Sequence, residues 1–168
     1  MSQLYSVWIV PRELSRPLKA TIDRLAEEYK SPKFEPHLTL LSQVEGEKEE
    51  MIDKAKKLAA ELSPFDLSLG EVAMSTTYYQ CVFVRVRPTA KLIEANLKAK
   101  EIFKLENDVF MPHISLAYGD FAPQTREEMM GKVILPQERD FRAEVLTMVP
   151  VTEDPAGWEH LIEAPLIG

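Results

Sequence analysis

The 168-residue sequence predicts an α+β fold arranged as two similar lobes. Helical patterns alternate along the chain with short strand patterns, most of which are joined by short loops. A helix followed by a strand that begins with Pro-His occurs twice, which indicates that one lobe resembles the other. Neither a G-x-G-x-x-G turn nor a P-loop is present, so the patterns do not favour a doubly wound nucleotide-binding sheet. We expect residues 1–168 to form one bilobal domain.

The N-terminal half predicts two strands, each followed by a helix. The first strand is rich in β-branched and aromatic residues and stops at Pro11. Ser15 is a good N-cap for the first helix, whose apolar residues recur at helical spacing. Pro32 and Pro36 then interrupt the chain, and the second helix opens with acidic residues that suit the helix dipole. The four elements are predicted over residues 4–10, 15–29, 37–42 and 47–62.

The C-terminal half predicts a second set of strands and helices. Thr89 is the expected cap of a helix that buries the apolar residues between 92 and 103. Pro112 precedes a strand, and a turn containing Asp-Pro-Ala-Gly at 154–157 separates the last two strands. The predicted strands are 65–74, 80–87, 113–118, 141–149 and 158–162, and the predicted helices are 90–103 and 125–130.

Composition and charge exclude several classes of protein. Cys81 is the only cysteine, so an intrachain disulfide is impossible and a reducing, cytoplasmic setting is expected. No apolar run approaches the roughly 20 residues of a membrane helix, and the N-terminus lacks the features of a signal peptide. The net charge of −7 argues against sequence-independent binding to long nucleic acids, although a local pocket could still hold a small phosphate ligand.

Two of the three histidines lie in matching sequence contexts. His37 opens the run His-Leu-Thr-Leu and His113 the run His-Ile-Ser-Leu, each directly after a proline. Side chains two residues apart on a strand point to the same side. His37 should therefore share a face with Thr39, and His113 with Ser115, while the intervening aliphatic residues anchor the strand in the core. If both strands border one cleft, the cleft holds two imidazoles and two hydroxyls.

This set of side chains suits the hydrolysis of a phosphodiester. An imidazole titrates near neutral pH, so one histidine can accept a proton from water while the other, protonated, gives one to the leaving oxygen. Two short hydroxyls can bind the non-bridging oxygens of the phosphate. A cyclic phosphate fits best, because ring strain helps to expel the leaving oxygen and no metal is then obligatory.

Other interpretations of the histidines stay open at this stage. A single histidine on a half-buried strand is more often a hydrogen-bonded structural residue than a catalyst, but the matched pair weakens that interpretation. A zinc site needs a third ligand, and His160, the remaining histidine, lacks the hydroxyl partner and is expected to be an ordinary strand residue. A non-catalytic nucleotide- or phosphate-binding module is a further alternative, although binding alone does not require two imidazoles.

The paired H-x-T/S motifs resemble those of the two-histidine phosphoesterase superfamily, and the chain is most similar to the plant-type cyclic phosphodiesterases. Similarity in length and motif order covers most of the chain, and the motif pair is more diagnostic than its flanking segments. The segments that carry the resemblance are Tyr-Ser-Val-Trp at 5–8, Phe-Glu-Pro-His at 34–37, Tyr-Gln-Cys-Val-Phe at 79–83 and Pro-His-Ile-Ser-Leu-Ala-Tyr-Gly at 112–119.

The resemblance implies a fold of two antiparallel sheets that form a concave cleft, with helices outside. It implies hydrolysis of ADP-ribose 1″,2″-cyclic phosphate to ADP-ribose 1″-phosphate, with a place in tRNA splicing, and of nucleoside 2′,3′-cyclic phosphates to 2′-phosphates. His113 would be the base and His37 the acid, with Thr39 and Ser115 holding the phosphate. No cofactor or metal is expected, and the expected partner is a small cyclic phosphate nucleotide bound by a monomer that contacts no membrane. RNA-end processing or ligation on the same fold is the alternative, which the acidic charge disfavours.

Aromatic residues around the motifs have more than one expected role. Similar enzymes place a tyrosine in the site at the position of Tyr118, although strict strand alternation would turn it away from His113 unless the strand ends before Gly119. The apolar neighbours of Trp8 and Phe83 favour packing in the sheet over stacking on a base. Tyr79 and the tyrosine before it lie in a predicted turn, where either could cover an adenine.

Overall fold

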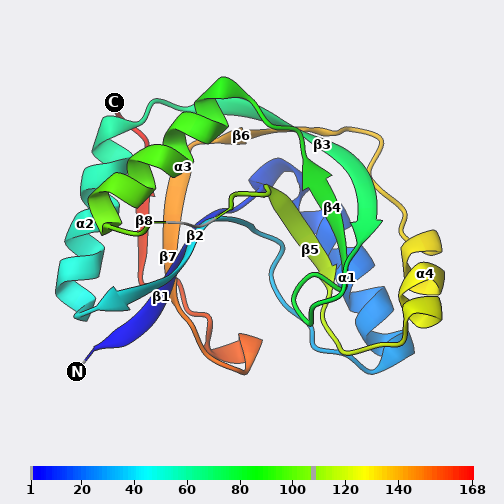
Figure 1. The fold of residues 1–168 in the computed structure, drawn as a ribbon. Coiled ribbons are helices and arrows are strands. Elements are labelled where there is room, and N and C mark those ends of the chain that lie inside the picture. The colour runs from blue at the N-terminus through cyan, green and yellow to red at the C-terminus, as the bar shows by residue number, and fades with distance from the viewer. Residues whose placement is uncertain (1, 107–108) are drawn as a thin grey trace.

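The computed structural model describes residues 2–106 and 109–168, and within them eight strands form one antiparallel sheet. The strand order across the sheet is β6-β3-β4-β5-β2-β1-β7-β8 (Figure 1). The strands are β1 (Gln3–Ile9), β2 (Leu38–Gly46), β3 (Phe65–Met74), β4 (Val82–Val86), β5 (His113–Ala117), β6 (Asp140–Ala143), β7 (Val145–Pro150) and β8 (Ile162–Pro165). The helices are α1 (Ser15–Tyr29), α2 (Lys48–Glu61), α3 (Ala90–Phe103) and α4 (Pro123–Gly131), with short 3-10 turns at Arg12–Leu14 and Pro155–Gly157.

The sheet consists of two four-stranded halves that meet at one narrow seam. One half is β6-β3-β4-β5, the other is β2-β1-β7-β8, and the pairing of Leu38 on β2 with Ile114 on β5 joins them. The expected α+β fold, with two antiparallel layers around a concave face, is therefore confirmed, and the seam makes the two layers one curled sheet. The paired residues are those that directly follow His37 and His113, so the seam carries both histidine motifs.

The chain crosses between the two halves at Glu144. Ala143 ends β6 at one edge of the sheet, and Val145 begins β7, which lies near the opposite edge. Only one residue separates these strands, so the sheet must curl until its two ends approach each other. The sequence predicted one strand over 141–149, and this prediction is wrong because the two parts pair with different neighbours, β6 with β3 and β7 with β1 and β8.

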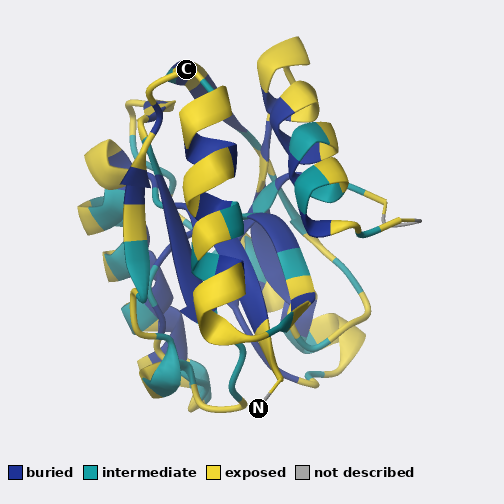
Figure 2. Ribbon diagram, turned by 90° about the vertical axis from the view of Figure 1, so that its left-hand side faces the viewer, coloured by how far each residue is buried: buried dark blue, intermediate teal, exposed yellow. Residues whose placement is uncertain are grey.

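The four helices cover the outer face of the sheet. Helices α1 and α4 contact strands β3 to β5, α2 contacts strands of the other half, and α3 spans both halves by contacting β2 and β3 (Figure 1). Figure 2 views the molecule from the side on which α2 lies and shows exposed outer helical faces with buried strands behind them. The Thr89 side chain accepts a hydrogen bond from the backbone N–H of Leu92 at 3.2 Å, so the predicted cap of α3 is confirmed. No helix within the described residues is both long enough and apolar enough to cross a membrane.

The last predicted strand, 158–162, is wrong in its position. The side chain of Asp154 accepts a hydrogen bond from the backbone N–H of Ala156 and starts the Pro155–Gly157 turn, after which the chain stays irregular until β8 begins at Ile162. Trp158 and His160 make specific contacts in this irregular segment, described below. His160 is therefore not the strand residue that the sequence predicted.

Candidate active site

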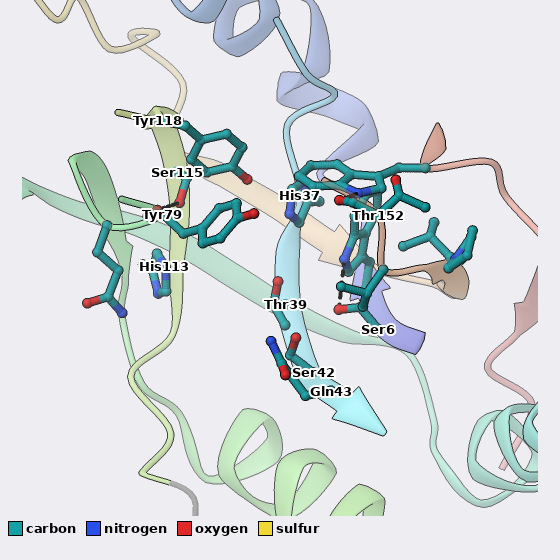
Figure 3. Close-up of a pocket in the computed structure, with 16 residues that line it drawn as sticks. Ser6, His37, Thr39, Ser42, Gln43, Tyr79, His113, Ser115, Tyr118 and Thr152 are labelled. Carbon is teal, nitrogen blue, oxygen red and sulfur yellow. Dashed lines mark hydrogen bonds between the residues drawn. The ribbon is translucent and has the colours of Figure 1, made fainter. Parts of the chain in front are cut away.

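All five site residues predicted from the sequence line one cavity of about 300 Å³ on the concave face. These residues are His37, Thr39, His113, Ser115 and Tyr118 (Figure 3). Continuing the antiparallel register of Leu38 and Ile114 places His37 level with Ser115, and Thr39 level with His113. Each imidazole therefore lies across the seam from the hydroxyl of the other motif. The structure brings the predicted residues together, and their chemical roles stay predictions.

Both histidines are held by the same hydrogen bond. Nδ1 of His37 lies 2.7 Å from the carbonyl oxygen of Glu35, and Nδ1 of His113 lies 2.7 Å from that of Met111. A carbonyl oxygen only accepts, so each Nδ1 carries the hydrogen and donates it. This fixes the neutral tautomer and leaves each Nε2 available to take up or deliver a proton. The carbonyl is two residues upstream in both cases, and the intervening proline restricts the backbone that presents it.

Burial lowers the pKa of both histidines. The loss of hydration is the largest cause for His37, opposed by the hydrogen bond to Glu35, and it brings the pKa from 6.5 to about 4. Burial also lowers the pKa of His113, again opposed by its backbone hydrogen bond and aided by the charge of Arg85. Both imidazoles are therefore mostly neutral at pH 7 in the unliganded protein. The mechanism expects one histidine to be protonated, and this requires a negative charge, such as that of a bound phosphate, to raise its pKa.

Trp8 on β1 forms the wall behind His37. Its ring stacks on the imidazole with centroids 3.7 Å apart and an angle of 14° between the planes, and only 2% of the residue is exposed. The indole Nε1–H donates to Oγ of Ser6 at 3.1 Å, and that hydroxyl donates to the carbonyl of Leu41 at 3.3 Å. Trp8 is packed, as the sequence favoured, but the partner is the candidate acid itself. Stacking against indole excludes water from one face of His37.

Strand β2 is irregular where it passes the cavity. Its pairing with β1 shifts register between Tyr5 and Val7, so Ser42 and Gln43 together oppose Ser6. Gln43 has a φ of 60°, the left-handed conformation that a β-bulge often requires. Both residues of the bulge line the cavity, and no pattern in the sequence marked either of them.

Tyr118 turns into the cavity because strand β5 ends one residue earlier, at Ala117. The Tyr118 ring stacks on Phe34 with centroids 3.9 Å apart, and 3% of the residue is exposed. Burial raises the pKa of the Tyr118 phenol, so the hydroxyl keeps its proton and remains a donor at any working pH. Gly119 follows with a φ of 159°, close to fully extended backbone.

The loop between β3 and β4 closes one side of the cavity. Tyr79 and Gln80 line it, and the hydroxyl of Ser115 donates to the Tyr79 carbonyl at 2.8 Å. Trp158 approaches from the other half of the sheet, with its ring centroid 5.8 Å from that of His37 and 6.0 Å from that of Tyr118. Its indole N–H donates to the carbonyl of Thr152 at 3.1 Å. Trp158 was not predicted to line the site, because its sequence pattern indicated a strand over 158–162.

The cavity wall carries no fixed charge. Among the described residues that line it there is no Lys, Arg, Asp or Glu, so the imidazoles are its titratable groups near neutral pH. Across the parts of the chain that the structure describes, no three His, Cys, Asp or Glu side chains are grouped so that they could hold a metal ion. His160 lies outside the cavity, with Nε2 2.5 Å from Glu35 and Nδ1 2.9 Å from Glu163. Burial opposes protonation of His160, but its bonds to the two carboxylates outweigh it and raise the pKa.

The model of a protein family described as "Cyclic phosphodiesterase-like protein" matches residues 1–160. The chain belongs to this family. The expectation of a two-histidine phosphoesterase, and of an enzyme that cleaves phosphodiesters, is thereby confirmed. A cyclic phosphodiesterase from Arabidopsis thaliana is 28% identical over 131 residues, which cover 77% of this chain and 72% of the plant protein.

Solved structures support the fold independently of close sequence similarity. Escherichia coli LigT complexed with 3′-AMP superposes with a TM-score of 0.67 at 16% identity, covering 100% of both chains. The protein TT0787 of Thermus thermophilus superposes with a TM-score of 0.63 at 20% identity, covering 100% of this chain and 99% of the other. At these identities the likeness shows the shared architecture, and the substrate has to be argued from the site itself.

Proposed function

We propose that the protein hydrolyses ADP-ribose 1″,2″-cyclic phosphate to ADP-ribose 1″-phosphate and nucleoside 2′,3′-cyclic phosphates to 2′-phosphates. The observation that carries the proposal is the pair of identically held imidazoles, each opposite the other motif's hydroxyl across one seam. Membership of the cyclic phosphodiesterase-like family and the likeness to LigT, which was solved with 3′-AMP, support it.

The reaction requires one proton to be removed from water and one proton to be donated to the leaving oxygen. Nε2 of His113 removes a proton from water as the water oxygen bonds to phosphorus, opposite the leaving oxygen. The bond from phosphorus to that ring oxygen breaks, and Nε2–H of His37 supplies the proton that the oxygen needs. A low pKa makes His37 a strong acid once it is protonated. The negative phosphate, by raising the pKa of His37, would provide that protonated state.

Neutral donors around the phosphate would bind its non-bridging oxygens. The Thr39 hydroxyl and the Tyr118 phenol can donate directly, since the phenol stays protonated. Ser115 would exchange its hydrogen bond to the Tyr79 carbonyl for one to the phosphate. Preorganised donors of this kind stabilise the negative charge that grows on the phosphorane oxygens. An uncharged wall suits a diester with one negative charge better than a monoester with two.

The test is a substrate panel with defined products. ADP-ribose 1″,2″-cyclic phosphate and the four nucleoside 2′,3′-cyclic phosphates are incubated with the protein, and the products are identified by ³¹P NMR. We expect ring opening to 1″- and 2′-phosphates, respectively. Binding of these compounds without any ring opening would instead support a non-catalytic nucleotide-binding module.

Hydrolysis should be independent of metal ions, because the two histidines supply both proton transfers. Incubation with EDTA followed by desalting is expected to leave kcat unchanged in the same assay. A loss of activity that added zinc restores would show that this account of the chemistry is wrong.

A further inference from the structure

A cationic side chain stands beside the histidine pair but outside the cavity. Arg85 on β4 pairs directly with His113 on β5, and Phe83 pairs with Ser115. Directly opposed residues of antiparallel strands place their side chains on the same face, with Cβ atoms about 5 Å apart. Arg85 therefore lies on the concave face, one strand away from the candidate base.

The guanidinium lies near the ring of Phe83, which in turn contacts the candidate base. Cζ of Arg85 lies 5.8 Å from the centroid of the Phe83 ring, and that ring lies 5.1 Å from the ring of His113. Phe83 therefore contacts both the guanidinium and the candidate base, and its backbone pairs with that of Ser115, the residue expected to bind phosphate. The charge also acts on His113, where it helps burial to lower the pKa of that histidine.

The surroundings of Arg85 leave its charge available to a ligand. Among the ion pairs formed by the described residues, none involves Arg85, and the residue is exposed. Gly70 on the next strand, β3, lies beneath it, where an added Cβ would come within 3.6 Å of both Cβ of Arg85 and Cγ of Arg87. Because Gly70 has no side chain, it covers neither Arg85 nor Arg87 on the concave face. The adjoining cavity wall has no fixed cation.

We propose that Arg85 binds a second phosphate group of the substrate, beyond the phosphate that is attacked between the histidines. A guanidinium binds phosphate through two parallel hydrogen bonds, and its charge remains at every working pH. Among the proposed substrates, the protein should therefore favour those that carry at least one further phosphate, such as the pyrophosphate of ADP-ribose 1″,2″-cyclic phosphate or a 5′-phosphate on a 2′,3′-cyclic nucleotide. The inference rests on the proposed function and adds a selectivity that the neutral cavity cannot supply.

The test compares two substrates that differ in one phosphate. Adenosine 2′,3′-cyclic phosphate and its 5′-phosphorylated form are assayed with the wild type, Arg85→Gln and Arg16→Gln. Arg16 is exposed on the outer helix α1, so its replacement changes the net charge equally without touching the concave face. We expect Arg85→Gln to lower the ratio of kcat/KM, phosphorylated over unphosphorylated substrate, by about tenfold or more, and Arg16→Gln to keep it. Using the ratio cancels any effect of Arg85 on His113.

Each result has a definite meaning. A ratio that is the same in Arg85→Gln and the wild type overturns the inference and leaves the proposed function standing. An equal fall in both variants would reflect net charge alone and would also overturn it. If the wild type opens neither ring, the proposed function is wrong and this selectivity has no basis.

Discussion

His37 and His113 share one hydrogen-bond pattern but occupy different environments. Each donates its Nδ1 hydrogen to a carbonyl two residues upstream. His37 is the more deeply enclosed, with Trp8 stacked on its ring and Trp158 in edge contact with both rings, whereas His113 borders Phe83 and the charge of Arg85. The two histidine motifs are equivalent in sequence. A difference in catalytic role between His37 and His113 therefore has to come from these surroundings.

The lowered pKa values predict an acid-shifted activity profile. The reactive state needs one protonated and one neutral histidine, and kcat/KM reports the pKa values of the free enzyme. Because burial lowers the pKa of both histidines below the ordinary 6.5, the protonated acid is lost as the pH rises through these lowered pKa values. We expect the maximum of kcat/KM below pH 6.5, with a fall of up to tenfold per pH unit on the alkaline side. A profile that is flat from pH 5 to 8 would contradict this.

Trp8 should control both the stability and the titration of His37. Trp8→Ala removes the stacked ring and admits water, so we expect the pKa of His37 to rise toward 6.5 and the free energy of unfolding to fall by about 3–5 kcal/mol. Trp8→Phe keeps a stacked ring but loses the hydrogen bond to Ser6 and part of the packed ring volume, at a cost of about 1–3 kcal/mol.

NMR titration of the His37 ring and denaturant unfolding measure these two effects. Trp8→Phe is the matched control, since its histidine should still titrate well below 6.5. A wild-type-like titration of His37 in Trp8→Ala would show that stacking is not what excludes water from the imidazole.

At the scale of the elements, helix α4 holds the loop between β3 and β4, which lines one side of the cavity. Arg126 is buried, with its Nε donating to the carbonyl of Phe121 and its Nη1 donating to the carbonyls of Ser75 and Thr77, each at 2.8 Å. The backbone N–H of Gly119 adds a bond to the Tyr78 carbonyl at 3.1 Å. Arg126, which touches neither histidine, therefore helps to hold the loop that carries Tyr79 and Gln80.

Replacing Arg126 should loosen this loop. Arg126→Met leaves three partly buried carbonyls without their donor, and we expect the free energy of unfolding to fall by about 3 kcal/mol and KM to rise more than kcat falls. Arg126→Lys keeps the charge but has one ammonium group for three separated acceptors, so it should rescue little. Steady-state kinetics and thermal unfolding measure both variants. Full rescue by lysine would mean that charge, and not the fork of donors, holds the loop.

Local patterns predicted most elements, and the exceptions have a common cause. The first helix and the third strand match their expected limits at Ser15–Tyr29 and Phe65–Met74, because apolar spacing is a local signal. The predicted cap of the first helix is wrong: Leu14 is the N-cap, and the Ser15 hydroxyl donates to the carbonyl of Pro11 in the preceding 3-10 turn. The predicted limits of the two closing strands were wrong because these limits depend on strand partners that are distant in sequence. Glu144 divides one predicted strand between two halves of the sheet, and Trp158 leaves the expected strand to line the cavity.

At the scale of the whole molecule, the seam between β2 and β5 creates the candidate site. Repetition of the Pro-His motif predicted that two strands would converge, and strand alternation correctly placed each hydroxyl beside its histidine. The pairing of Leu38 with Ile114 aligns each histidine with the hydroxyl residue of the other motif. This alignment could not be predicted from the sequence, because a register depends on both strands. The residues contributed by bulges and loops, such as Gln43 and Trp158, were missed for the same reason.

The most direct measurement is the turnover of His37→Ala, His113→Ala and the double variant on one 2′,3′-cyclic nucleotide, with folding checked by circular dichroism and thermal unfolding. The account predicts that each single variant loses about 10²–10⁴ in kcat while staying folded, and that the double variant falls far less than the product of the two losses, because the imidazoles act on one phosphorus together. Near-normal turnover in either single variant would contradict the account.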